Sequence, residues 1–102
     1  MTSLIVETIT IPQIRHVIVT DEALTVDLSD GRTISAPLAW YPRLLNGSRE
    51  ERNNLRLTGG QEGIHWPDLD EDVSLKNIIL GQPSGESHQS FQHWLEQRAA
   101  QG

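Results

Sequence analysis

Residues 15–36 read RHVIVTDEALTVDLSDGRTISA, and this stretch decides the fold. Apolar and polar residues alternate from Leu24 to Ser29, which is the pattern of a β-strand with one buried face. Asp21-Glu22 predicts a tight reversal before that strand, and Asp30-Gly31 is a strong signal for a two-residue hairpin after it. Residues 15–20 and 32–36 supply the flanking strands. The stretch therefore predicts an antiparallel meander.

Short helices are predicted after Pro37. Apolar residues recur at helical spacing between positions 38 and 45, with Pro42 suited to a first turn and Asn46-Gly47 suited to ending a helix. Ser48 and Glu51 have the spacing of a capping box, which predicts the start of a second short helix. Residues 55–58 are interpreted as a further strand.

The C-terminal third is predicted to be helical. Ser74 caps a helix of about two turns with a buried stripe, and Gly81 ends it. Residues 82–86 resemble a linker, and a last helix begins near Ser87, with Phe91, Trp94 and Leu95 on one side. The sequence thus predicts an α+β fold: a small antiparallel sheet, built as a hairpin meander, with short helices packed on one side and a C-terminal helix.

Two extensions flank the predicted domain at residues 13–81. Residues 1–12 contain an alternating, β-branched run at 3–11 that predicts a strand, and residues 82–102 form the linker and last helix. An exposed edge strand has to be paired or covered. Both extensions are therefore expected either to fold back on their own domain or to pair with a second copy, with a slight preference for a homodimer.

The charge balance points to a protein partner. The chain has 102 residues and a net charge of −6, from 8 basic and 14 acidic residues. This charge disfavours direct binding to nucleic acid, which needs clustered basic side chains, and it suits a basic protein. There is no cysteine, so no disulfide or thiol chemistry is expected. No secretory signal and no apolar run long enough for a membrane span are seen, so a cytoplasmic protein is expected. The arginines at positions 43, 49, 52 and 56 are interpreted as a solvated helix face.

Residues 59–74, GGQEGIHWPDLDEDVS, are interpreted as a shaped surface loop that leads into a helix. Its acids are expected to lie just before the positive end of that helix, where carboxylates are favourable. Their spacing resembles the start of a calcium loop, but Val73 and Ile79 stand where such a loop needs glycine and glutamate. No metal and no cofactor are predicted.

His65 leaves two alternatives open. It is three residues from Asp68 and five from Asp70, so a small metal-dependent or acid–base enzyme could be built on these side chains. The favoured interpretation is that His65 fixes the loop by packing and one hydrogen bond. No nucleophile elbow, cysteine nucleophile or phosphate-binding loop is present, and no catalytic residue is assigned.

Two segments together resemble a known bacterial family. Residues 38–44, LAWYPRL, and residues 60–74, GQEGIHWPDLDEDVS, resemble the domain of unknown function 2442, and the resemblance covers about residues 13–81. It implies a small α+β domain of prokaryotes and their mobile elements, often encoded beside a second small protein, as in toxin–antitoxin pairs. Some relatives carry a helix-turn-helix domain next, but the tail here is too short and too acidic for one.

These observations favour a non-enzymatic protein-interaction module, resembling an antitoxin or a regulatory adaptor. A transcriptional accessory protein is a further alternative. The aromatic residues Trp40, Tyr41 and Trp66 are expected mainly in the core, with Trp66 the best candidate for partial exposure. The predicted partner-binding residues are Trp40, Tyr41, Arg43, His65, Trp66, Asp68, Asp70, Glu71, Asp72, Phe91 and Trp94.

Overall fold

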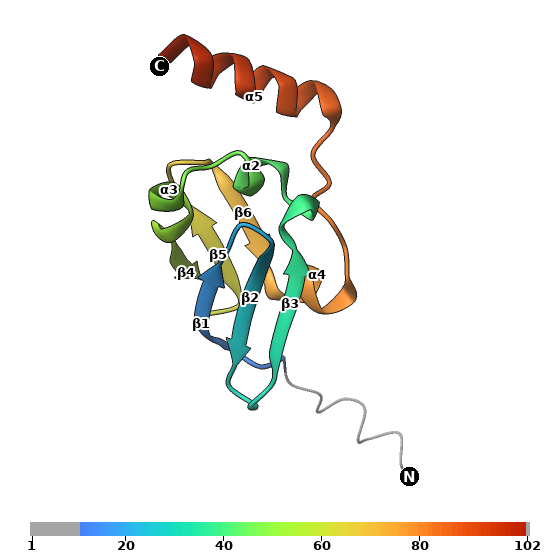
Figure 1. Ribbon diagram of the computed structural model, residues 1–102. Helices are drawn as coiled ribbons and strands as arrows, with labels where there is room; N and C mark the ends of the chain where they lie inside the picture. The colour runs from blue at the N-terminus through green and yellow to red at the C-terminus, as the bar shows by residue number, and fades with distance from the viewer. Residues whose placement is uncertain (1–10, 102) are drawn as a thin grey trace.

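The computed structural model describes residues 11–101 and has an α+β architecture, as predicted. The strand predicted at residues 3–11 lies, except for its last position, outside the described residues. Two three-stranded antiparallel sheets pack against each other, and short helices gather at one end of them (Figure 1). The predicted sheet is present, but the second sheet was not predicted.

The first sheet confirms the meander. It consists of β1 (Ile14–Val19), β2 (Ala23–Leu28) and β3 (Thr33–Pro37), in that order. The β2–β3 turn differs from the predicted two-residue hairpin. Leu28 N–H donates to the Arg32 carbonyl at 2.8 Å, which leaves a three-residue loop, and Gly31 takes the left-handed position with φ 94°. Such a loop uses glycine as readily as the two-residue turn does, so Asp30-Gly31 fits both.

The second sheet corrects the interpretation of residues 59–74 as a surface loop. It consists of β4 (Arg56–Thr58), β5 (Gly63–Trp66) and β6 (Glu71–Ser74). In the β5–β6 pair, Ile64 lies opposite Val73 and His65 opposite Asp72. One turn, which contains Gly59 and Gly60, precedes β5, and a second turn at residues 67–70 separates β5 from β6. Each of these two strands therefore has only four residues. Strands this short show too little alternation to stand out from their turns.

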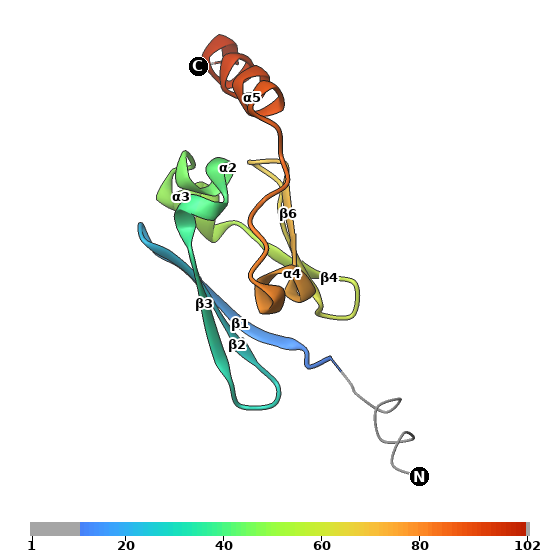
Figure 2. The same ribbon diagram turned by 90° about the vertical axis from the view of Figure 1, so that its right-hand side faces the viewer.

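One apolar core lies between the two sheets (Figure 2). The buried face of β2, formed by Leu24, Val26 and Leu28, belongs to the same cluster as Ile64 and Trp66 of β5. Backbone hydrogen bonds join the sheets as well. Residues 60–62 in the β4–β5 turn accept from three donors outside that hairpin: the Gln13 side chain (3.2 Å) and the amides of Ile14 and Leu75 (2.8 Å each).

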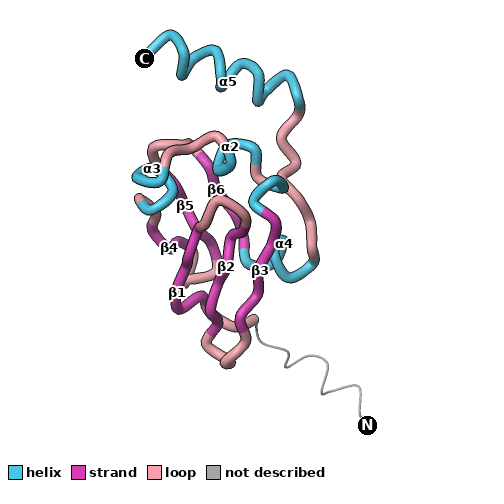
Figure 3. Tube along the Cα trace, viewed as in Figure 1, coloured by secondary structure: helices cyan, strands magenta, loops and turns pink. Residues whose placement is uncertain are grey.

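The short helices gather at one end of the sheets, apart from α4 (Leu75–Leu80) beside β3 and β6 (Figure 3). The gathered helices are η1 (Leu38–Trp40), α2 (Pro42–Leu45) and α3 (Arg49–Asn53). The Ser74 hydroxyl accepts from the Asn77 amide, and Gly81 ends α4 in the left-handed conformation, as predicted. Among residues 11–101, every helix is too short or too polar to cross a bilayer.

The last helix, α5 (His88–Gln101), packs on its own domain, and Trp94 is its buried residue. Trp94 is buried, stacks on Phe91 with ring centroids 5.7 Å apart, and lies under the guanidinium groups of Arg43 (5.2 Å) and Arg98 (4.7 Å). Of the two placements expected for the tail, the structure has the one in which it folds back. The homodimer stays a prediction.

The capping box of α3 also holds α5. The Ser48 hydroxyl accepts from the Glu51 amide at 3.1 Å, and the Glu51 carboxylate accepts from the Ser48 amide at 2.9 Å, which confirms the prediction. The same carboxylate accepts two hydrogen bonds from Arg98, at 2.9 and 3.1 Å. These bonds, first from Arg98 and then from Ser48, lower the pKa of Glu51 from 4.5 to about 2.

This pKa predicts an acid sensitivity that Glu51→Gln should reduce. A carboxyl group with a lowered folded pKa stabilises the fold fully above its unfolded pKa and loses that contribution as pH falls. The free energy of unfolding should therefore drop between about pH 4.5 and pH 2, and less steeply in Glu51→Gln than in the wild type. Urea unfolding across this range measures the difference. Glu50→Gln is the control, and equal slopes in all three proteins would contradict the prediction.

Candidate functional site

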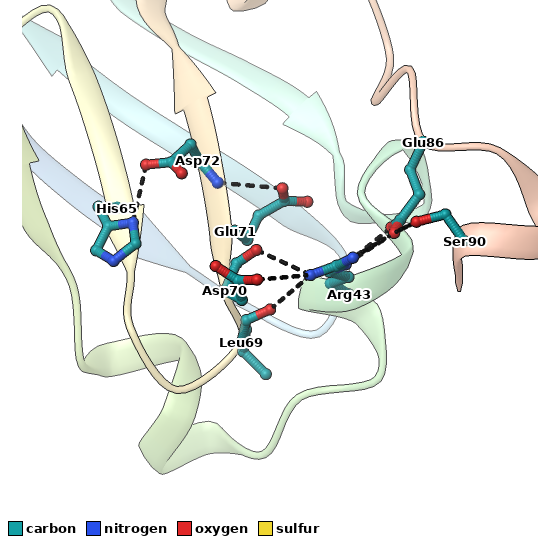
Figure 4. Close-up of polar contacts among 8 residues, drawn as sticks. All are labelled: Arg43, His65, Leu69, Asp70, Glu71, Asp72, Glu86 and Ser90. Atoms are coloured by element: carbon teal, nitrogen blue, oxygen red, sulfur yellow. Dashed lines mark hydrogen bonds and ion pairs between the residues drawn. The ribbon is translucent and has the colours of Figure 1, made fainter. Parts of the chain in front are cut away.

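Arg43 of α2 is the centre of a polar cluster between the second sheet and the segment before α5 (Figure 4). Its Nε lies 2.9 and 3.0 Å from the two carboxylate oxygens of Glu86, and its Nη2 donates to the same carboxylate. Its Nη1 donates to the carbonyl of Asp70 at 2.9 Å. The Ser90 hydroxyl also donates to Glu86, at 2.7 Å. Arg43 thus ties the β5–β6 turn to the chain segment that leads into α5.

The pair of Arg43 and Glu86 is held in its ionised form. Hydrogen bonds to Arg43 lower the pKa of Glu86, and the same bonds raise the pKa of Arg43. Both side chains are mostly buried, and each charge has a direct partner. A bidentate arrangement of this kind is stronger and more specific in direction than a single ion pair. The contact therefore fixes the position of residues 82–86 relative to the sheet.

A cleft of about 480 Å³ lies beside this pair. Its walls are β6, the start of α5, and residues 82–86, and its lining includes Tyr41, Arg43, Asp70, Glu71, Asp72 and Asn77. Two buried oxygens, the Tyr41 hydroxyl and Oε2 of Glu71, have no hydrogen-bond partner among the described residues. Burial raises the pKa of both groups, and the negative charge of Glu71 raises that of Tyr41 further.

The rim of the cleft is acidic and open to solvent. The side chains of Asp70 and Asp72 are 86% and 73% exposed. Asp70 has a left-handed backbone with φ 51°, a conformation that aspartate tolerates better than most residues. It turns the chain between β5 and β6 and directs the backbone carbonyl at Arg43. Arg43 therefore holds this turn from the protein interior, while the carboxylates of Asp70 and Asp72 are exposed to solvent.

His65 pairs with Asp72 and not with Asp68 or Asp70, the two acids that the enzymatic alternative combines with it. Its Nδ1 lies 2.8 Å from Oδ1 of Asp72, the residue opposite it in the β5–β6 ladder. Asp68 instead accepts from the Asn54 side chain at 2.9 Å, and Oδ2 of Asp70 lies 3.6 Å from Arg43. The pairing of His65 could not be predicted from spacing along the chain, because β5 and β6 form a hairpin in which residues on opposite strands are neighbours.

The described residues contain no cluster of three or more groups suited to holding a metal ion. The expectation that the acids lie at the start of α4 also needs correction. Glu71 and Asp72 belong to β6, and no acidic residue lies in the first turn of α4. Their charge is therefore displayed by a strand and a turn rather than neutralised by a helix end.

Several predicted partner residues are in the interior. Trp66 is fully buried and donates from its indole nitrogen to the Arg52 carbonyl at 2.9 Å, so its expected partial exposure is wrong. Tyr41 is also buried, whereas Trp40 and Phe91 are half-buried and pack against the core. Trp94 is buried under the guanidinium groups of Arg43 and Arg98. Trp66 follows Ile64 on the inward face of β5, which is why the ring points into the core.

The predicted solvated helix face is wrong for Arg52. Its guanidinium is buried and donates to the carbonyls of Leu44 (2.8 Å) and Leu45 (2.9 Å), which satisfies the end of α2, and to Asp21 (2.7 Å). Glu86 was missed as a site residue. The only local sequence signal for Glu86 is Ser90 four residues later, which donates to its carboxylate. Its main partner, Arg43, lies 43 positions away in the sequence.

This fold and cleft define a small α+β domain with a polar, acid-rimmed cleft and an added C-terminal helix. The chain belongs to the family described as "Protein of unknown function (DUF2442)", whose model matches residues 14–84. The matched region contains both sheets and α4, and it ends before Glu86 and α5. The resemblance noted from the sequence is confirmed.

Two solved structures share the fold. A crystal structure of a protein of unknown function from Rhodospirillum rubrum has a TM-score of 0.65 at 24% identity, over 76% of this chain and 95% of that one. A solution structure of an uncharacterized protein from Chromobacterium violaceum has a TM-score of 0.61 at 18% identity, over 89% of this chain and 82% of that one. No curated protein matches the chain.

Proposed function

We propose that this protein is a non-enzymatic interaction module that binds a basic partner protein at the acidic rim of the cleft. The observation that carries the proposal is the exposure of two carboxylates, Asp70 on a turn that is fixed from inside by Arg43 and Asp72 in the strand that follows it. Charged groups at a rim attract and orient an oppositely charged partner. A rigid support lowers the entropy cost of holding them in place.

The net charge of −6 supports a basic partner and argues against direct contact with nucleic acid. The proposed role is that of an antitoxin or a regulatory adaptor, acting in the cytoplasm. The partner is expected to be a small protein encoded beside this one. The anchoring roles first assigned to Trp66 and Tyr41 are not part of the proposal, because both rings lie in the core.

The enzymatic alternative has less support. It needs His65 to act together with Asp68 and Asp70, and among the described residues no hydrogen bond or ion pair joins His65 to either of them. The single pair of His65 and Asp72 resembles that of His16 and Asp27, which also face each other across two strands, with nitrogen and oxygen 3.5 Å apart. A cross-strand pair of this kind has a structural explanation.

Affinity capture with a charge variant tests the proposal. The tagged full chain is used to capture proteins from the organism that encodes it, in parallel with Asp70→Asn/Asp72→Asn. Asparagine keeps the shape of both side chains and tolerates the left-handed backbone at position 70. A basic protein should be retained by the wild type and reduced about tenfold or more by the variant, as expected for the loss of about 1.4 kcal/mol.

Glu22→Gln/Glu50→Gln is the matched control, because it removes the same charge from two exposed side chains outside the cleft. It should retain the partner like the wild type. Equal losses with both double variants would mean that only net charge matters. Identical capture by all three proteins would place the contact elsewhere. Either outcome would overturn the proposal.

A further inference from the structure

The interior of the cleft contains a pair of polar atoms that the protein itself does not satisfy. The Tyr41 side chain is 2% exposed, and neither its hydroxyl nor Oε2 of Glu71 has a hydrogen-bond partner among the described residues. The other Glu71 oxygen accepts from the Asp72 amide at 3.1 Å. Buried polar atoms nearly always have a partner, because leaving one without costs stability. Both residues line the cleft, so a ligand there could supply the missing partner.

The charges around these atoms define what kind of ligand fits. Four carboxylates line the cleft, from Asp70, Glu71, Asp72 and Glu86, and the only lysine or arginine in its lining is Arg43. Arg43 already donates to Glu86 and to the Asp70 carbonyl. The remaining carboxylates leave an excess of negative charge in a concave, partly buried site, which concentrates cations.

A metal ion is a poorer fit than an organic cation. The described residues do not bring three or more metal-ligating groups together, whereas a tyrosine hydroxyl and a carboxylate oxygen in the lining of one cleft can both accept from N–H donors. Ammonium and guanidinium groups carry several such donors on an apolar stem. Val73 and Pro83 in the lining supply apolar surface for that stem.

We propose that the cleft receives one lysine or arginine side chain of the basic partner, whose cationic head donates to the Tyr41 hydroxyl and to Oε2 of Glu71. This inference rests on the proposed function and names the contact at its centre. The exposed carboxylates of Asp70 and Asp72 attract the cation, and the buried pair holds it. Both oxygens are shielded from solvent, so binding requires the lining of the cleft to open around them.

Titration of the ¹⁵N-labelled full chain with tripeptides tests this proposal. The probes are Ala-Arg-Ala and Ala-Lys-Ala, with Ala-citrulline-Ala as a neutral analogue of nearly the same shape, at millimolar concentrations and with blocked termini. Saturable shifts are expected for the amides of residues 70–73, 82 and 84–86 with at least one cationic peptide, and none with citrulline. Spermidine is the fourth probe. Tighter binding of spermidine at the same amides would assign the cleft to a free polyamine and overturn the partner side chain.

Tyr41→Phe and Glu71→Gln provide the decisive comparison. Each should weaken peptide binding about fivefold or more, since each removes one acceptor. Each should also melt at or above the wild-type temperature, because Tyr41→Phe removes an unsatisfied buried hydroxyl and Glu71→Gln removes a partly buried negative charge. Equal peptide affinity in the wild type and both variants, or equal shifts with citrulline, would overturn the inference.

The two proposals can fail separately. If Asp70→Asn/Asp72→Asn loses the captured protein while Tyr41→Phe and Glu71→Gln keep it, the rim binds the partner and the buried pair does not. That result overturns only the inference drawn here. If the peptides bind as expected and no basic partner depends on the rim, the cleft is a cation site and the proposed function is overturned.

Discussion

Replacing Trp66 with alanine is expected to destabilise the protein by about 3–5 kcal/mol, the range for removing a large aromatic side chain from a packed core. The ring is fully buried between the two sheets, and its indole N–H satisfies the carbonyl of Arg52 at 2.9 Å. The substitution therefore creates a cavity and leaves a buried acceptor without a donor. Urea unfolding, followed by circular dichroism, measures the loss.

Trp66→Phe separates these two effects, because it keeps most of the apolar volume and removes only the N–H donor. It should lose clearly less stability than Trp66→Ala. Trp40→Ala is a second control, since Trp40, the last residue of η1, is only half-buried. A loss below about 1 kcal/mol in Trp66→Ala would contradict the core position. Weaker partner binding per folded molecule would instead restore Trp66 as a contact residue.

Replacing Arg52 with alanine is expected to cost about 1–3 kcal/mol, the cost of leaving one buried polar group without a partner. The guanidinium is a donor for the carbonyls of both Leu44 and Leu45 at the end of α2. Removing it leaves the Leu45 carbonyl without a donor among the described residues, whereas the Leu44 carbonyl keeps the Gly47 amide at 3.1 Å. The free energy of unfolding in urea checks the magnitude.

Asp21→Asn isolates the ion pair from the backbone contacts. The Asp21 side chain is 89% exposed, so its pairing with Arg52 is largely screened by water and should contribute less than about 1 kcal/mol. Arg49→Ala removes an exposed arginine of the same helix and should be close to neutral. If Asp21→Asn destabilised the protein as much as Arg52→Ala, the ion pair and not the carbonyl contacts would explain the burial of Arg52.

The parts of the fold that could be predicted are those with strong local patterns. The meander was predictable because β2 has six residues that alternate cleanly. The caps at Ser48 and Ser74 were predictable because a cap depends on residues three positions apart. Of the second sheet, the strand predicted at residues 55–58 is present as β4. β5 and β6 were missed, because they have four residues each and the glycines and acids around them are typical of loops.

The candidate site was only half predictable for a related reason. Asp70, Glu71 and Asp72 are adjacent in sequence, so they could be chosen as an acidic surface. The buried contact between Arg43 and Glu86 joins residues 43 positions apart, so no local sequence pattern predicts it. Successive residues of a strand point to opposite faces of the sheet, so the acid that faces inward depends on which residues of β6 point to the core. Interpreting this segment as a loop gave no basis for that assignment.

The β4–β5 turn has a practical consequence for anyone modifying the protein. Its Gly59-Gly60 pair looks like a harmless place for an epitope tag or an inserted reporter, since loop tips with small residues usually accept insertions. Three carbonyls of this turn are bonded to Gln13, Ile14 and Leu75, so an insertion there would separate elements from both sheets at once. Asp30 and Gly31 at the β2–β3 turn are exposed and, among the described residues, are bonded only to Leu28 and Arg32, so they are the safer position for such engineering.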